Sequence, residues 1–158
     1  MITKTSEHAL RVLQYVAGTQ HRGLVPLREV AQELRESPSY IAKIARELVK
    51  AGILRAGRGV RGGVVLTRSP EQITLLEVVE ACQGSLLADH CQARCAPEAV
   101  CSYHQAAVEL RDAMAGVLER WSLARLMARP WVIRASVPCT MAGEQNVATA
   151  PETTGGTA

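Results

Sequence analysis

The sequence predicts a mainly α-helical fold with one small β-hairpin. Apolar residues recur at helical spacing in three consecutive segments between residues 5 and 52. A glycine-rich segment then separates two short runs rich in β-branched and aliphatic residues, and a further helical pattern extends over residues 103–126. Hydrophobic residues make up 47% of the chain and Phe is absent, so Leu, Val, Ile and Ala must build the core.

The first two helices are expected over residues 5–19 and 27–34, because each segment has an apolar stripe at helical spacing. The first stripe consists of Ala9, Val12, Leu13 and Val16, and the second consists of Leu27, Val30, Ala31 and Leu34. Glycines at 18 and 23 break the pattern between the two segments.

A third helix is expected to begin after the turn at residues 36–39. Ser37 is a suitable N-cap and Pro38 fits the first helical position. The apolar stripe consists of Ile41, Ile44, Ala45 and Leu48, and Gly52 ends the helix. Two short helices joined by a tight turn are typical of a helix-turn-helix.

A β-hairpin is expected next, with strands at residues 53–55 and 64–67. The loop between them contains Gly57, Gly59, Gly62 and Gly63. A helix-turn-helix followed by a basic hairpin is a winged helix. Arg58 and Arg61 lie at the tip, where long cationic side chains can enter a narrow minor groove of DNA.

The rest of the chain predicts a short helix at residues 72–83, an irregular stretch at 84–101 and a long helix at 103–126. The long helix carries a heptad seam, made of Tyr103, Ala107, Leu110, Met114, Val117, Trp121 and Ala124. Such a seam favours homodimerisation, and the alternative is packing within the same subunit. Residues 142–158 contain one Val and no Leu or Ile, so the tail is expected to be disordered.

These patterns divide the chain into four parts. They are a winged helix-turn-helix DNA-binding domain (1–68), a short helix with a cysteine-containing sensor loop (69–102), a dimerisation helix (103–127) and a disordered tail (128–158).

The charge distribution favours double-stranded DNA as the partner. Residues 1–68 carry 12 Lys and Arg against 5 Asp and Glu, whereas the remainder is net acidic. The candidate DNA-binding residues are Arg28, Ser39, Tyr40, Lys43, Arg58 and Arg61. No signal peptide or membrane-spanning run is recognised, so a cytoplasmic protein is expected. No nucleophile–base pair or phosphate-binding loop is found, so neither an enzyme nor a small-molecule substrate is expected.

Three cysteines in the irregular stretch predict a metal site. Cys91, Cys95 and Cys101 form a C-x3-C-x5-C pattern, and soft thiolate ligands suit an iron–sulfur cluster or zinc. His104, one helical turn beyond Cys101, is a candidate fourth ligand; Glu7 or His8 of the first helix is the alternative. Cys82 lies on an apolar stripe and is expected in the core, and Cys139 lies in the weakly patterned tail.

The chain resembles, over residues 1–127, the bacterial winged-helix regulators that include the IscR, NsrR and RirA proteins. The most specific match is the segment from Arg58 to Leu66, which has the family's R-G-x-x-G-G-x-x-L pattern. Ser39-Tyr40, Leu48 and Ala51-Gly52 match the family's recognition helix, and residues 73–79 match the helix before the sensor loop.

The resemblance implies a homodimeric transcription regulator, a repressor, that binds a palindromic operator. It also implies an iron–sulfur cluster on Cys91, Cys95 and Cys101, with [2Fe–2S] favoured over [4Fe–4S]. The IscR type implies His104 as the fourth ligand, whereas some redox and nitric-oxide sensors imply an acid at the position of Glu7. The spacing between Cys91 and Cys95 is shorter than in IscR, so the cluster type and the signal stay open.

Three alternatives to a cluster-controlled regulator remain at this point. One is a winged-helix regulator that binds zinc or has no cluster. Another is an iron–sulfur or zinc accessory protein that uses the helical front as a docking module, against which the basic glycine-rich hairpin argues. The third is a metal-free interaction protein.

Overall fold

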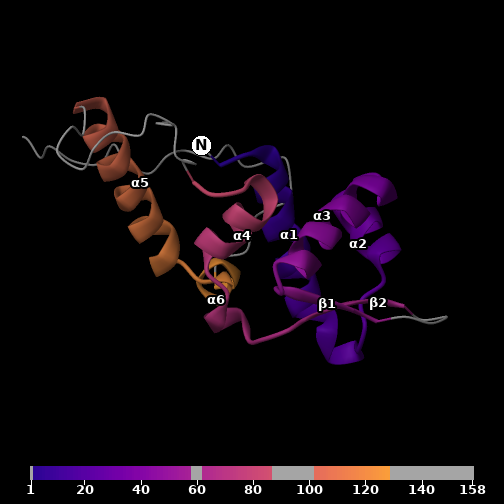
Figure 1. Cartoon of the computed structure of the whole chain (residues 1–158). Helices are drawn as coiled ribbons and strands as arrows, with labels where there is room; N and C mark the ends of the chain where they lie inside the picture. Colours follow the sequence, from indigo (N-terminus) through magenta and orange to yellow (C-terminus); the bar gives the residue numbers. More distant parts are fainter. Residues whose placement is uncertain (1, 58–61, 87–101, 129–158) are drawn as a thin grey trace, which may run out of the picture.

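The computed structural model describes residues 2–57, 62–86 and 102–128 of the chain. Figure 1 shows α1 in the middle, with α2, α3 and the hairpin on one side and α4, α5 and α6 on the other. The elements are α1 (Lys4–Thr19), η1 (Gln20–Arg22), α2 (Leu27–Leu34), α3 (Pro38–Lys50), β1 (Leu54–Gly57), β2 (Gly63–Leu66), η2 (Pro70–Gln72), α4 (Leu75–Gln83), α5 (Ser102–Arg120) and α6 (Leu123–Met127). The mainly α-helical class with one hairpin is therefore confirmed.

The core forms around the apolar face of α1. The predicted stripe of α1 is fully buried and packs with the stripes of α2 and α3. The same hydrophobic cluster continues into α4, Leu118 of α5 and Leu123 of α6. Among the described residues, the buried hydrophobic side chains are those of Ala, Val, Leu and Ile, as expected for a chain without Phe.

Local capping fixes where α2 ends and where α3 begins and ends, and thereby the turn of the helix-turn-helix. The Ser37 hydroxyl accepts a hydrogen bond from the Tyr40 backbone N–H at 3.2 Å, and Pro38 occupies the first turn of α3. Arg35 ends α2 in the left-handed conformation with a φ of 55°. Gly52 follows α3 with a φ of 72°, a conformation that favours glycine. The predicted turn and the predicted end of α3 are both confirmed.

The hairpin pairs β1 with β2 in antiparallel fashion, with Leu54 opposite Leu66 and Gly57 opposite Gly63. Val25 adds one isolated bridge to Val64, with both backbone N···O distances at 2.9 Å. This bridge requires glycine at 63, because a Cβ there would lie 2.4 Å from the Val25 carbonyl oxygen. The bridge pairs residues far apart in the sequence, so no local pattern at Val25 predicts it.

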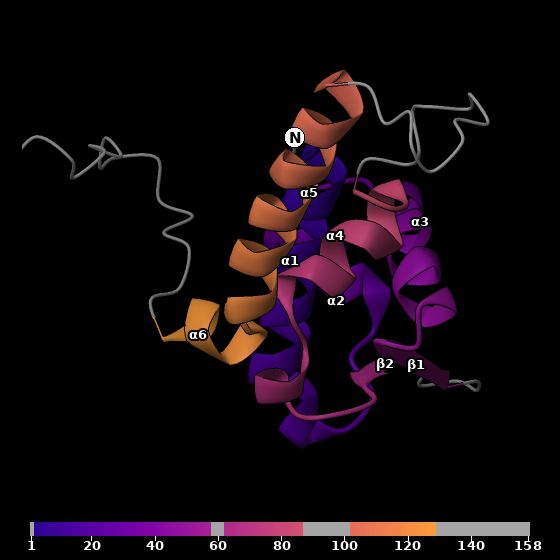
Figure 2. The same ribbon diagram turned by 60° about the vertical axis from the view of Figure 1, so that its left-hand side comes forward.

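The single long helix predicted over residues 103–126 is wrong in its last two turns. α5 ends at Arg120, and the Ser122 hydroxyl caps α6 by accepting from the Arg125 N–H at 3.2 Å. The break, visible in Figure 2 as a change of direction between α5 and α6, is held by two backbone hydrogen bonds of 2.8 Å. The N–H of Leu75, the first residue of α4, donates to the Trp121 carbonyl, and the Leu123 N–H donates to the carbonyl of Ile73, just before α4. These long-range bonds replace the intrahelical ones.

No helix among the described residues has the length and apolar character needed to cross a bilayer.

Candidate DNA-binding surface and sensor region

The exposed face of α3 carries a basic stripe. Burial of Ile41, Ile44 and Leu48 fixes the inner face of this helix and thereby its outer face. The outer face exposes four residues spaced by four, three and four positions: Ser39, Lys43, Arg46 and Lys50. Ser39 and Lys43 were predicted for this surface. Arg46 and Lys50 were missed, although their helical spacing from Lys43 was a readable signal.

Tyr40 is half-buried and contacts α1. Its ring lies edge-on to the ring of His8, with centroids 5.4 Å apart and planes at 77°. His8 Nε2 lies 2.8 Å from a Glu36 carboxylate oxygen, and Nδ1 lies 2.7 Å from the Lys4 carbonyl. His8 therefore contacts the turn before α3 and the start of α3. From the sequence alone, it had been one possible metal ligand.

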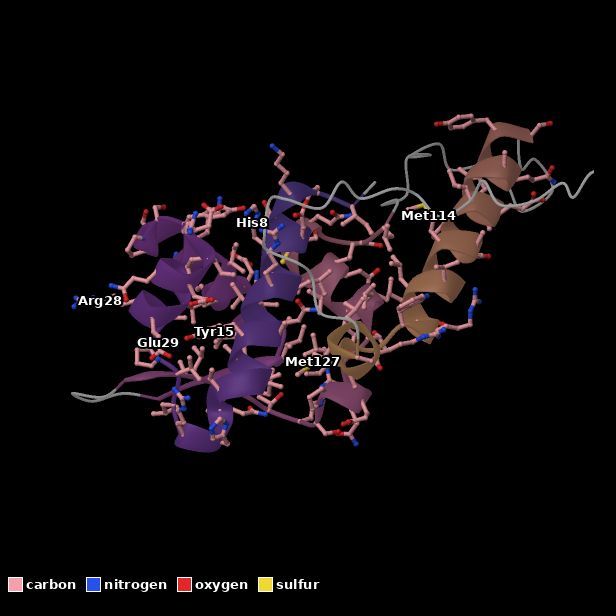
Figure 3. All side chains as sticks on the ribbon, turned by 180° about the vertical axis from the view of Figure 1, so that it is seen from behind. His8, Tyr15, Arg28, Glu29, Met114 and Met127 are labelled. Carbon is pink, nitrogen blue, oxygen red and sulfur yellow. The ribbon has the colours of Figure 1, made fainter. Side chains whose placement is uncertain are left out.

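Arg28 is exposed at the start of α2. Figure 3 shows its side chain at the outer edge of the molecule, away from α1. The next residue, Glu29, fixes α2 to α1, because the Tyr15 hydroxyl donates to its carboxylate at 2.7 Å. This hydrogen bond, together with burial and the nearby negative charge, raises the pKa of Tyr15 to about 12.

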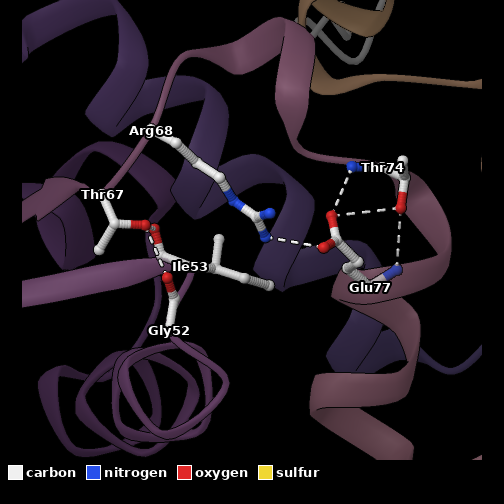
Figure 4. Close-up of polar contacts among 6 residues, drawn as sticks. All are labelled: Gly52, Ile53, Thr67, Arg68, Thr74 and Glu77. Atoms are coloured by element: carbon white, nitrogen blue, oxygen red, sulfur yellow. Dashed lines mark hydrogen bonds and ion pairs between the residues drawn. The ribbon is translucent and has the colours of Figure 1, made fainter.

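The base of the hairpin is bonded to the end of α3. The Thr67 hydroxyl donates to the Gly52 carbonyl at 2.6 Å and lies 3.1 Å from the Ile53 carbonyl (Figure 4). Gln20 also accepts a hydrogen bond from the Leu66 N–H at 3.2 Å. Arg55 of β1 is exposed, and it was not among the predicted residues. The predicted tip residues Arg58 and Arg61 lie outside the described residues.

The predicted cysteine ligands Cys91, Cys95 and Cys101 also lie outside the described residues. His104 is half-buried in the first turn of α5. Glu7 forms an ion pair with Arg11, one turn along α1, at 3.0 Å. Within residues 2–57, 62–86 and 102–128, no group of three His, Cys, Asp or Glu side chains is placed to hold a metal ion.

Cys82 lies on α4 and is half-buried against the core, as predicted. Burial, with a smaller contribution from the charge of Glu47, raises the pKa of this thiol to about 11. The thiolate is therefore scarce at neutral pH, which suits a structural thiol better than a metal ligand.

α5 divides the predicted heptad seam between two faces. Met114 and Leu118 pack against the core of the same subunit. Tyr103, Leu110 and Val117 are seven residues apart and remain exposed, with 71%, 55% and 46% of their surface accessible. Trp121 extends this exposed line, and the Arg125 guanidinium lies 4.2 Å from its ring centroid. Met114, placed on the dimer seam from its spacing, belongs largely to the intramolecular face.

A helix-turn-helix with a basic outer stripe, fixed to an adjacent β-hairpin, defines a winged-helix DNA-binding protein. The model of the Rrf2 family, described as an iron-dependent transcriptional regulator, matches residues 2–129. The chain belongs to the Rrf2 family of transcriptional regulators, a non-enzymatic class, and it is a DNA-binding regulator.

The matches to two curated relatives span most of each relative and most of this chain. The HTH-type transcriptional regulator NsrR of Geobacillus kaustophilus is 29% identical over 130 residues, which are 80% of this chain and 88% of the relative. The regulator IscR of Escherichia coli is 28% identical over 154 residues, which are 96% of this chain and 91% of the relative. The similarity predicted from the sequence is thus confirmed.

Solved structures share the fold. CymR (YrzC), described as the global cysteine regulator of B. subtilis, has a TM-score of 0.64 and 23% identity, with 81% of this chain and 96% of that chain covered. IscR of T. potens has a TM-score of 0.63 and 21% identity, with 81% and 86% covered. At this identity the two structures support the winged-helix fold alone.

Proposed function

We propose that the chain is a homodimeric transcription repressor whose operator affinity is controlled by an iron–sulfur cluster. DNA binding is supported by the exposed stripe of α3, in which Ser39, Lys43 and Arg46 lie on one face beside the hairpin. Lys and Arg on such a face neutralise phosphates or donate to the acceptors on guanine, while Ser and Tyr serve phosphates and base edges. A recognition helix of this kind docks in the major groove.

The remaining DNA-binding candidates extend the same surface. Arg28 is exposed at the start of α2, the helix that crosses the DNA backbone in this arrangement. Arg55 is exposed on β1, next to the segment that contains Arg58 and Arg61. Arginines on a narrow hairpin suit a flanking minor groove, where A·T tracts concentrate negative potential.

The exposed line on α5 supports a homodimer. Tyr103, Leu110 and Val117 repeat at heptad spacing, which is the spacing that two paired helices bury. Each large apolar side chain contributes about 1.5–3 kcal/mol when it leaves water completely. A two-fold dimer presents two copies of α3 and therefore reads an operator with two half-sites.

The donor set after α4 suits an iron–sulfur cluster. Three thiols at positions 91, 95 and 101, followed by the His104 imidazole, provide the soft and intermediate ligands that such clusters take. The match to an iron-dependent family and the relationship to IscR and NsrR support iron over zinc. A bound cluster supplies a redox-active centre that can also react with small molecules such as nitric oxide.

His104 is the proposed fourth ligand, and [2Fe–2S] is the proposed cluster. His104 lies in the first turn of α5, three residues after Cys101, so its recruitment needs no rearrangement of α1. Glu7, the competing candidate, is already paired with Arg11 at 3.0 Å. Recruiting Glu7 would break that ion pair, whereas recruiting His104 breaks no ion pair found among the described residues.

Anaerobic purification followed by absorption spectroscopy with iron, sulfide and zinc analysis tests the cluster. Near-equal iron and sulfide with visible charge-transfer bands is expected, and Cys95→Ala should lose them. His104→Ala should alter the bands while Glu7→Gln leaves them unchanged. Stoichiometric zinc without sulfide, or a complete cluster in Cys95→Ala, would contradict the proposal.

A further inference from the structure

We propose that Gln83 and His8 are positioning residues for operator recognition. They connect α4 to the DNA-reading end of α3 through the first turns of α1. This inference rests on the proposed reading of DNA by α3, but the contacts that suggest it lie away from the basic stripe.

The first contact joins the end of α4 to the start of α1. The Gln83 side-chain oxygen accepts from the Ser6 hydroxyl at 3.2 Å and from the Thr3 backbone N–H at 3.3 Å. Thr3 is the N-cap of α1 and accepts from the Ser6 N–H. Ser6 is fully buried, and its hydroxyl also lies 3.1 Å from the Thr3 hydroxyl, so replacing Gln83 by an apolar residue would remove the acceptor that joins this hydroxyl to α4.

The second contact joins α1 to the turn and to α3. His8 follows Ser6 by two residues, and its imidazole lies between two oxygen acceptors, the Lys4 carbonyl at 2.7 Å and the Glu36 carboxylate at 2.8 Å. The ring is thereby fixed in orientation, and Tyr40 packs edge-on against it. Glu36 lies in the turn before α3 and Tyr40 in its first turn.

These two contacts connect four segments in space, one after another. They are the end of α4, the start of α1, the turn of the helix-turn-helix and the start of α3. Because a hydrogen-bonded helix turn is stiff, α1 transmits the position of Gln83 to His8. Figure 1 shows the N-terminal end of α1 beside the end of α4, with α3 on the opposite side of α1. Loss of either contact should therefore misplace Tyr40 and reduce discrimination between DNA sequences, with little effect on charge-driven non-specific binding.

The experiment uses the full chain and a duplex enriched by the wild-type protein from a random library. Affinity is measured for this duplex and for a scrambled duplex of the same composition. Gln83→Met, which keeps length but removes the acceptor, should bind the enriched duplex about fivefold more weakly and the scrambled duplex unchanged. His8→Phe, which keeps a ring near Tyr40 but removes both ring nitrogens and their contacts with Lys4 and Glu36, should behave similarly. Gln72→Met, at an exposed position of η2, and His21→Phe, at an exposed position of η1, are the matched controls.

A second readout requires no DNA. In protein labelled at tyrosine rings, the Tyr40 resonances should shift in both Gln83→Met and His8→Phe and stay in place in the two controls. Gln83→Met with unchanged Tyr40 signals and unchanged discrimination would overturn the inference. If the wild-type protein enriches no duplex, the proposed DNA reading fails, and the Tyr40 signals still decide whether Gln83 positions this ring.

Discussion

The Arg68 guanidinium donates to the Glu77 carboxylate at 2.8 Å, so the segment leaving the hairpin is bonded to the first turn of α4. The other Glu77 oxygen accepts from the Thr74 N–H at 2.9 Å and completes a capping box, as Figure 4 shows. Burial alone would raise the pKa of Glu77, but the Thr74 N–H and the Arg68 charge outweigh it and hold this pKa below its usual value.

Replacing Glu77 by Gln should destabilise the fold modestly. The carboxylate is 38% exposed, so solvent screening limits the expected loss to about 0.5–1 kcal/mol. Because the folded-state pKa is lowered, this contribution is present above the ordinary Glu range and is lost as pH falls through the folded-state pKa. Urea unfolding should show that the difference in free energy of unfolding between the wild-type protein and Glu77→Gln is smaller at pH 3 than at pH 7. Glu80→Gln, at an exposed position of the same helix, should unfold with the free energy of the wild-type protein at both pH values.

Replacing Gly63 by Ala should weaken the attachment of the hairpin. The new Cβ would lie 2.4 Å from the Val25 carbonyl oxygen, which is backbone and cannot rotate away. A cost of about 1–3 kcal/mol is expected, typical of overpacking. Gly18→Ala is the control, because a Cβ there meets nothing within 4 Å. If thermal melting places Gly63→Ala at or above the wild-type midpoint, the bridge between Val25 and Val64 does not form as described.

Tyr15 should ionise well above the ordinary tyrosine range, near its pKa of about 12. Since this folded-state pKa is raised above the ordinary value near 10, the stabilisation from the Tyr15–Glu29 bond is complete below pH 10. It is lost as pH rises through about 12. An ultraviolet titration of tyrosinate should show a late phase that Tyr15→Phe removes and Tyr103→Phe retains. A late phase that persists in Tyr15→Phe belongs to another residue and contradicts the assignment.

The sequence predicted the first three helices and the hairpin well because their signals are local. Apolar spacing, the Ser37 cap and the left-handed position at Gly52 act within a few residues. The break after Arg120 could not be predicted in the same way, since it depends on long-range backbone hydrogen bonds between Trp121 and Leu75 and between Leu123 and Ile73.

The candidate site shows the same division between local and tertiary signals. Exposure of Ser39 and Lys43 follows from the stripe on the opposite face of α3. The contacts of His8 with Glu36 and Tyr40 join segments that are about 30 residues apart, and no local sequence pattern around His8 predicts them. The ligand set at Cys91, Cys95 and Cys101 stays a prediction.

Replacing Leu110 by Glu should convert the proposed homodimer to a monomer. Leu110 is 55% exposed in the single subunit and occupies the centre of the heptad line on α5, so a buried charge there would oppose pairing. Light scattering during size-exclusion chromatography measures the mass of each form. Gln105→Glu adds the same charge at an exposed position of α5 off this line and should remain dimeric. A monomeric wild-type protein, or a dimeric Leu110→Glu protein, would refute pairing through this face.

If the outer face of α3 reads duplex DNA, its cations should contribute to the salt dependence of binding to the enriched duplex. Lys43→Ala should weaken binding and lower the slope of log affinity against log salt by about 1, as expected when one phosphate contact is lost. Arg111→Ala removes a positive charge from α5 and should leave both quantities at their wild-type values. A Lys43→Ala protein that binds the enriched duplex with the affinity and the salt slope of the wild-type protein would contradict the reading of DNA by α3.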